Sequence, residues 1–389
     1  MIPVSEAKQH ITQSLRRGAV EWIPLSEALN RVLAEDVTST VQVPHFDNSA
    51  MDGYAFHFES WQGQALKIVG EVAAGNSASQ PCEPGTAVRI FTGAKVPSGA
   101  DTVVMQEKTR VEEGMLFVED ALLKQGGNVR LAGSQTRAGQ KVADSGTPLT
   151  APMIGFLASL GIAAVPVFSQ PKVAIIVTGN EIVPPGQPLH DGQVYECNSY
   201  SLRAAFQAMG IQPTVERCED SPAAIGKAIA EALTSCDLLV LTGGVSVGDY
   251  DFVVPALEQH GVEQIFHKVK QKPAKPLYFG QYKQAVVFGL PGNPASVLTS
   301  FYVYVKPWLS HYQGGEAWPV HTAQFVGNHS SKPGLTRFLK GKYDGQTVAL
   351  TDGQESYRMD GFAVANCIIE LAAEVETLQA GDIVTIIPF

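Results

Sequence analysis

The sequence has little charge, and the charge that it carries is mostly acidic. Only 17% of its 389 residues are charged, and 38 acidic side chains against 28 basic ones give a formal net charge of −10. This balance argues against non-specific binding to nucleic acid, because a phosphate backbone is held by basic surfaces. An anionic ligand would therefore have to be held by local donors or a metal ion, not by the field of the whole chain.

Cysteine is scarce, and long apolar runs are missing. The five cysteines lie far apart without a CxxC pair, which argues against a zinc knuckle or a disulfide framework and favours reduced thiols. No run approaches the ~18 apolar residues of a membrane-spanning helix. The N-terminal stretch MIPVSEAKQH lacks the apolar core of a signal peptide. We therefore expect a cytoplasmic protein that neither enters a membrane nor binds nucleic acid.

What is present is a globular composition with 45% hydrophobic residues. At roughly 100–200 residues per domain, the length suggests two to four domains. Near the N-terminus, apolar residues from Leu25 to Leu33 recur at helical spacing after Pro24. A second helix is predicted from Thr150, its N-cap, through APMIGFLASLG. We therefore expect a discontinuous helical region over residues 1–45 and 129–170.

Two further regions have the pattern of β-structure. Residues 46–128 contain short apolar runs, ALKIVGEV and GTAVRIF, between turns rich in Gly, Pro and Ser, which predicts an inserted β-rich domain. Residues 318–389 contain short strand-like runs that end in DIVTIIPF. This pattern predicts a small C-terminal β-barrel or sandwich.

Residues 171–312 alternate between strands and helices. KVAIIVTG, DLLVLTGG and QAVVFGLPG are predicted strands. Two helices are expected with Asn198 and Ser221 as their N-caps, and a further helix over PASVLTSFYVYVKPWL. Such alternation is typical of a mostly parallel sheet covered on both faces. The predicted fold class is thus multidomain α/β plus β, with a Rossmann-like α/β domain at its centre.

Three tight, polar turns follow predicted strands of this domain. They begin at Thr178-Gly179, Thr242-Gly243-Gly244 and Leu290-Pro291. Ligands of open parallel sheets bind beyond the carboxyl ends of the strands. One Gly-rich loop is usually only a turn, but three at the same edge favour a binding site.

The loop TGGVSVGDYD combines an anion-binding feature with two acidic side chains. Its glycines expose backbone N–H groups suited to phosphate, whereas Asp249 and Asp251 close the loop. A divalent cation could bridge a substrate phosphate to one carboxylate, as Mg²⁺ commonly does. Alternatively, both carboxylates cap the following helix.

Two other segments are unusual. KVKQKPAKP places Lys272 and Lys275 in a basic run stiffened by prolines; it is either a solvated surface loop or a contact for an anionic substrate. PHFDNSAMDGYA, which includes Asp52, is either a β-turn or a polar patch that serves a ligand or another subunit.

These motifs, in this order along nearly the whole chain, resemble the MoeA family of molybdopterin molybdenumtransferases, which includes the E domain of gephyrin. The motifs that carry the resemblance are PHFDNSAMDGYA, GTAVRIFTGAKVPSGADTVVMQE, VAIIVTGNE, TGGVSVGDYD, KPAKP and FGLPGNP. The resemblance implies a homodimer with a helical and β-rich N-terminal region, a molybdopterin-binding α/β domain and a C-terminal β-barrel.

The family's reaction inserts molybdenum from molybdate into adenylylated molybdopterin and releases AMP. The resemblance implies Mg²⁺ as cofactor, a molybdopterin adenylyltransferase upstream, and molybdoenzymes or their chaperones downstream. Asp52, Thr92 and Glu181 are the implied catalytic residues, and Glu181 and Asp251 the implied metal ligands. The implied substrate-binding residues are Gly243, Gly244, Ser246, Asp251, Lys272, Lys275, Pro291, Asn293 and Pro294.

One motif departs from the family pattern. Where many members carry a Gly-acid-Asp step, this chain has Gly133-Ser134-Gln135. This departure leaves open a catalytically weakened homologue that acts as a molybdopterin-binding or scaffold protein. The α/β domain alone would also suit an adenylyltransferase that acts one step earlier, but the flanking domains count against that alternative.

Overall fold

The structure is a computed structural model, and it describes residues 1–76, 81–245 and 252–389. The chain forms two compact units. The first contains residues 1–21, 30–34 and 166–389, and the second contains residues 22–29 and 35–165. In the described residues, no helix is long and apolar enough to cross a membrane.

A six-stranded sheet in the order β16-β13-β17-β21-β20-β18 forms the centre of the first unit. The first four strands in that order are parallel, and β20 and β18 add an antiparallel edge. The strands are β13 (Val173–Thr178), β16 (Thr214–Cys218), β17 (Leu238–Thr242), β18 (Glu263–His267), β20 (Tyr278–Tyr282) and β21 (Ala285–Leu290). The predicted sheet is confirmed, and it is mixed because β20 runs antiparallel to both of its neighbours.

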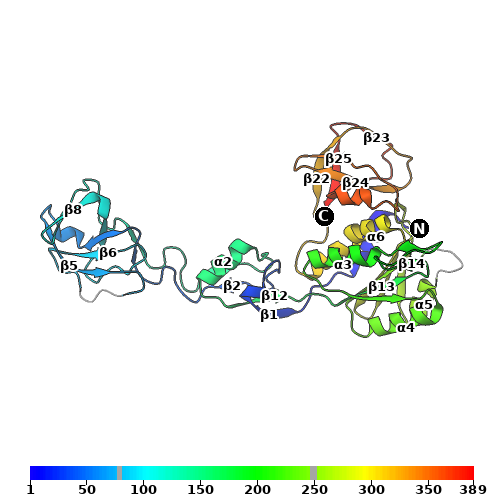
Figure 1. Ribbon diagram of the computed structural model, residues 1–389, viewed down its shortest axis with the longest axis horizontal. Helices are drawn as coiled ribbons and strands as arrows, with labels where there is room; N and C mark the ends of the chain where they lie inside the picture. Colours follow the sequence, from blue (N-terminus) through cyan, green and yellow to red (C-terminus); the bar gives the residue numbers. More distant parts are fainter. Residues whose placement is uncertain (77–80, 246–251) are drawn as a thin grey trace. The chain divides into compact units, whose positions relative to one another are not determined.

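Helices cover both faces of this sheet, as predicted, and Figure 1 shows α3 and α6 on one side with α4 and α5 on the other. Along β17, Leu238 and Val240 contribute to one buried cluster, whereas Leu239 and Leu241 contribute to another. This alternation follows from the two-residue period of a strand. The helices are α1 (Val4–Gln13), α3 (Asn198–Ala208), α4 (Pro222–Leu233), α5 (Val253–Gln259), α6 (Pro294–Ser300) and α7 (Lys306–Tyr312).

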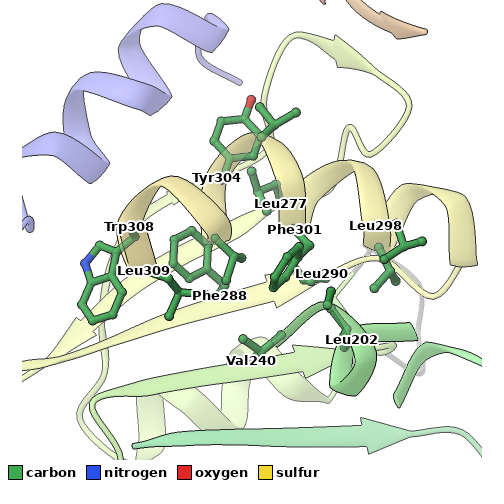
Figure 2. Close-up of a cluster of buried hydrophobic side chains, with 14 of the residues drawn as sticks. Leu202, Val240, Leu277, Phe288, Leu290, Leu298, Phe301, Tyr304, Trp308 and Leu309 are labelled. Atoms are coloured by element: carbon green, nitrogen blue, oxygen red, sulfur yellow. The ribbon is translucent and has the colours of Figure 1, made fainter. Parts of the chain in front are cut away.

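The helical run after β21 is not uniform, although the sequence predicts one plain helix there. A π-helical turn, Phe301–Val305, separates α6 from α7. Figure 2 shows this run over the sheet, with Phe301 and Leu298 facing Leu290 and Leu202. The same cluster includes Val4 and Ile11 of α1, so α1 belongs to the first unit.

The C-terminal part of the first unit is a closed β-barrel, which confirms that prediction. Its strands follow the order β24-β25-β22-β28-β26, and β24 pairs with β26 to close the ring. They are β22 (His321–Val326), β24 (Thr336–Tyr343), β25 (Thr347–Leu350), β26 (Cys367–Leu371) and β28 (Ile383–Pro388). A short strand, β19 (Gln271–Lys272), pairs with β24 and joins the barrel to the α/β part.

The second unit is β-rich, as predicted. Its six-stranded sheet has the order β7-β4-β6-β5-β9-β8. The strands are β4 (Gly53–Phe56), β5 (Leu66–Val72), β6 (Thr86–Ile90), β7 (Thr102–Met105), β8 (Thr109–Glu112) and β9 (Met115–Val118). Helix α2 (Ala151–Ser159) also lies here, and the Thr150 hydroxyl accepts a hydrogen bond from the Met153 N–H at 3.4 Å, which confirms this N-cap.

The helix expected over Leu25–Leu33 is wrong. Only one 3₁₀ turn forms there, Leu25–Glu27. Asn30 has a left-handed backbone with φ of 63°, which ends helical geometry, and Leu33 instead pairs with Val167. The apolar spacing reflects separate burial of Leu25 and Leu33. The exact domain boundaries proposed from the sequence stay a prediction.

Candidate functional site

The parallel strands bring the predicted turns together at one edge of the sheet. Val177 of β13 is in register with Thr242 of β17, which is in register with Leu290 of β21. The turns that follow these strands line a cavity of about 1290 Å³ within the first unit. Residues of the C-terminal barrel region, including Phe338 and Ser356, also line it.

Most of the residues predicted to bind substrate line this cavity. They are Gly243, Gly244, Lys272, Lys275, Pro291, Asn293 and Pro294, together with Glu181. Ser246, Asp249 and Asp251 lie outside the described residues, so their predicted roles stay predictions.

The glycines of the second turn are required by close packing. Both have positive φ, 87° for Gly243 and 61° for Gly244. A Cβ on Gly243 would lie 2.8 Å from the backbone oxygen of Thr178, and one on Gly244 would lie 2.8 Å from Cγ2 of Val253. The turn therefore brings its backbone close to β13 and leaves its cavity side without side chains.

Thr178 supplies a buried hydroxyl at this edge. Its side chain is 5% exposed, and within the described ranges its Oγ1 has no hydrogen-bond partner. A buried hydroxyl without a partner costs free energy, about 1–3 kcal/mol. Thr178 also lines the cavity, and its hydroxyl lies under the glycine turn.

Positive charge lines the other side of the cavity. In the parallel pairing of β19 with β24, Lys272 is in register with Arg337, and Lys275 also lines the space. Glu181 adds a carboxylate, and in the described part of the chain no cluster of three or more His, Cys, Asp or Glu could hold a metal by itself. One carboxylate alone is a weak metal site, so a divalent ion here would need further oxygen ligands from a bound ligand and water.

The loop around Ser356 belongs to the barrel and reaches the α/β turns. Ser356 Oγ accepts a hydrogen bond from Asn293 Nδ2 at 3.1 Å, and its backbone oxygen accepts one from the Ala295 N–H at 3.1 Å. Neither Ser356 nor Arg337 belongs to a sequence motif that predicts a site. Only the fold of the barrel region brings them to the cavity.

Lys340 organises that loop from inside the barrel. The side chain is almost fully buried at 3% exposure. Its ammonium group donates to the backbone oxygens of Gly353, Glu355 and Arg358, and burial lowers its pKa. Three carbonyl acceptors compensate the cost of burying the charge, so the loop is fixed around the lysine.

The N-terminus of α3 is held by a buried acid rather than by the predicted cap, Asn198. Glu196, 2% exposed, accepts from the Ser199 N–H at 2.7 Å and from the Ser199 hydroxyl at 2.5 Å. Arg217 donates to the same carboxylate at 2.9 Å. Asn198 Nδ2 instead donates to the Gly292 backbone oxygen at 2.9 Å, which ties α3 to the turn after β21.

Asp52 and Thr92, two of the predicted catalytic residues, meet in the second unit. Oδ1 of Asp52 accepts hydrogen bonds from the Thr92 N–H and from the Thr92 hydroxyl, each at 2.8 Å. These bonds lower the pKa of Asp52, with a smaller contribution from the charge of Arg89. Asp52 is therefore an ionised, oriented carboxylate at neutral pH.

An open α/β sheet with glycine-rich strand ends and basic residues around a cavity is an arrangement suited to anionic ligands. Residues 174–311 match the family model of a probable molybdopterin binding domain. Residues 2–161 match the MoeA N-terminal region (domains I and II), and residues 323–389 match the MoeA C-terminal region (domain IV).

Full-length similarity to known proteins then gives the family. The molybdopterin molybdenumtransferase of Haemophilus influenzae is 36% identical over 400 residues, covering 100% of this chain and 99% of that protein. The Staphylococcus aureus (strain COL) protein of the same name is 32% identical over 399 residues, covering 99% and 95%. The crystal structure of the molybdopterin biosynthesis MoeA protein of Pyrococcus horikoshii aligns with a TM-score of 0.83 at 28% identity, covering 100% of both chains. The chain belongs to the MoeA family of molybdopterin molybdenumtransferases.

Proposed function

We propose that this protein inserts molybdenum from molybdate into adenylylated molybdopterin and releases AMP. The observation that carries the proposal is the cavity itself. In a chain with a net charge of −10, it combines glycine-rich strand ends with Lys272, Lys275 and Arg337. These groups suit a ligand that carries several phosphate or oxyanion charges. Family membership supports the adenylylated pterin, together with molybdate, as that ligand.

In this proposal the cavity binds and orients the anionic groups. Lys272 and Lys275 pair with oxyanions, and the amides around Gly243 and Gly244 receive phosphate. Asn293, between Pro291 and Pro294, stays fixed by its hydrogen bond to Ser356. Ser246 and Asp251 would contribute to the same binding. Mg²⁺, held by Glu181 and Asp251, would neutralise charge on the phosphoanhydride when bound.

The chemical step is cleavage of the bond between the adenylyl phosphorus and the bridging oxygen. A water molecule attacks that phosphorus, the bridging oxygen leaves with the pterin phosphate, and AMP departs with the new P–O bond. The two dithiolene thiols bind the molybdenum of molybdate, and one molybdate oxygen leaves with their two protons as water. Asp52, oriented by Thr92, is the proposed group that accepts the proton of the nucleophile. Glu181 would act at the phosphoanhydride as a ligand of the Mg²⁺ ion.

We further propose that the protein works as a homodimer in the cytoplasm, with Asp52 and Thr92 serving the cavity of a second copy. The family resemblance supports this arrangement, and the five free cysteines suit a reducing compartment. A molybdopterin adenylyltransferase would supply the substrate, and molybdoenzymes or their chaperones would receive the product.

The test incubates the purified protein with adenylylated molybdopterin, molybdate and Mg²⁺ and measures AMP by chromatography. We expect AMP release that depends on molybdate. Lys272→Ala should weaken substrate binding roughly 10- to 100-fold, because a charge-assisted hydrogen bond is lost. The matched control is Lys270→Ala, since Lys270 lies in the same basic run but is exposed and does not line the cavity. Absence of AMP at saturating substrate, or consumption of ATP with release of pyrophosphate, would contradict the proposal.

A further inference from the structure

A buried tyrosine lies in the π-helical turn between α6 and α7. Tyr304 is fully buried, with 0% of its surface exposed. Its ring packs in the cluster that covers the sheet, but Figure 2 shows its hydroxyl pointing away from Phe288 and Leu290. Burial holds the pKa of Tyr304 well above its usual range. The hydroxyl therefore keeps its proton and can donate a hydrogen bond.

The hydroxyl of Tyr304 begins a relay of two hydrogen bonds. It donates to Oε1 of Gln271, and Nε2 of Gln271 donates to the backbone oxygen of Ala274 at 2.8 Å. Gln271 is 1% exposed, so its amide is held at both ends away from water. The relay thus connects the π-helical turn to the segment Lys272–Pro276, which we call the lysine loop.

The lysine loop has a backbone that needs support. Ala274 has φ of 61°, a left-handed conformation that costs a residue with a side chain roughly 1–2 kcal/mol. Ala274 is itself 5% exposed. The loop is also held by a hydrogen bond from the Val269 N–H to the Lys275 backbone oxygen at 3.0 Å. The Gln271 amide therefore fixes the one strained residue between the two lysines of the cavity.

A buried polar relay is an unusual way to fill this space. Apolar side chains of the same shape would pack there without needing partners, whereas each buried polar group is costly if one bond is lost. The relay has a specific end point, the carbonyl between Lys272 and Lys275. It starts from a π-helical turn, a feature that is frequent at functional sites. The relay therefore fixes the backbone that positions the ammonium groups of Lys272 and Lys275.

We propose that Tyr304 and Gln271 are positioning residues that hold the lysine loop in the geometry that binds the anionic substrate. The inference rests on the proposed function for its ligand, but the state of the loop can be measured without any ligand. Neither residue touches substrate in this proposal. Both act through the backbone of Ala274.

The first measurement is hydrogen exchange of the loop in the free protein. Tyr304→Phe removes one hydroxyl and leaves the ring, and we expect exchange in the peptide covering residues 268–277 to become roughly tenfold faster. Tyr302→Phe is the matched control. It makes the same change in the same π-helical turn, but the Tyr302 ring stacks on Phe389 at a centroid distance of 4.3 Å. Equal exchange in wild type and Tyr304→Phe would overturn the inference whether or not the protein is a molybdenumtransferase.

The second measurement uses molybdate as the probe in titration calorimetry. Tyr304→Phe should weaken binding about 5- to 10-fold, as expected for one net hydrogen bond, while Tyr302→Phe binds like wild type. If wild type binds and Tyr304→Phe binds equally well, the inference fails and the proposed function stands. If wild type neither binds molybdate nor releases AMP, the proposed function fails. The hydrogen-exchange comparison of wild type with Tyr304→Phe then tests by itself whether the relay holds the lysine loop.

Gln271→Glu distinguishes positioning from simple packing. A carboxylate still accepts from Tyr304 but cannot donate to Ala274, so exchange should accelerate at pH 8. Burial favours the neutral acid, and its hydroxyl can donate to the Ala274 carbonyl. Lowering the pH to about 5 should therefore restore slow exchange, after correction for the intrinsic pH dependence with wild type. A pH-independent defect would overturn the assigned role of the Gln271 amide.

Discussion

The carboxylate of Asp52 accepts both the backbone N–H and the hydroxyl of Thr92, each at 2.8 Å. Forty positions separate the two residues in the sequence, yet one oxygen receives both bonds. Hydrogen bonds to the charged form stabilise it, which explains the lowered pKa of Asp52. The pair is the best-defined polar contact among the residues predicted to be catalytic.

Thr92→Val should raise the pKa of Asp52 toward its ordinary value of 3.8. A depressed folded-state pKa contributes stability above the unfolded-state pKa, and this contribution disappears as the pH falls through the folded-state value. The variant should therefore be less stable than wild type at neutral pH, and the two stabilities should become equal in strong acid. Carbon-detected NMR titration of the Asp52 carboxyl measures the shift. Thr109→Val, whose hydroxyl donates to the Gln106 backbone oxygen, should leave the titration unchanged.

Glu196→Ala should destabilise the first unit by about 2–4 kcal/mol, because it leaves the buried Ser199 donors and Arg217 without their acceptor. Arg217→Gln should cost less than about 1 kcal/mol, since the Arg217 side chain is 36% exposed and solvent screens the ion pair. Urea unfolding followed by circular dichroism compares the two. Equal losses would show that the ion pair, not the hydrogen bonds to Ser199, stabilises the N-terminus of α3.

Lys340→Met should lower the free energy of unfolding by about 2–4 kcal/mol, because the carbonyls that the lysine holds lose their donor. Met has a similar length, so no large cavity forms. Lys342→Met, at an exposed position on the same strand, is the control and should change stability little. Thermal unfolding gives the comparison. A loss of AMP release without any loss of stability would mean that Lys340 acts on substrate directly.

The thiols of Cys218, Cys236 and Cys367 should react slowly with iodoacetamide in the native protein. Burial raises the pKa of each to about 11, so about one thiol in a thousand is ionised at pH 8, and the thiolate is the reactive form. In urea, the same thiols should react roughly a hundredfold faster as their pKa returns toward about 8.5. Mass spectrometry of tryptic peptides resolves the individual sites. Rapid native labelling at any of them would contradict the assigned burial.

Local sequence patterns predicted most of the architecture. Alternating apolar strands and capped helices gave the α/β sheet, and Thr150 and Ser221 were correctly predicted as caps because each hydroxyl bonds the N–H three residues later. The error at Leu25–Leu33 has a physical cause. Apolar periodicity indicates which residues are buried, but it does not indicate the backbone conformation that buries them. A single residue with a left-handed backbone, Asn30, divides the predicted helix into separate segments.

The sequence by itself determined the strand-end turns, because glycine and proline restrict the backbone through short-range sterics wherever they occur. It also placed Lys272 and Lys275 next to each other in the chain. Only the tertiary structure decided that Arg337 stands beside Lys272, that Ser356 bonds Asn293, and that Tyr304 supports the lysine loop. Such contacts depend on barrel closure and on the register between distant strands, which no short stretch of residues encodes.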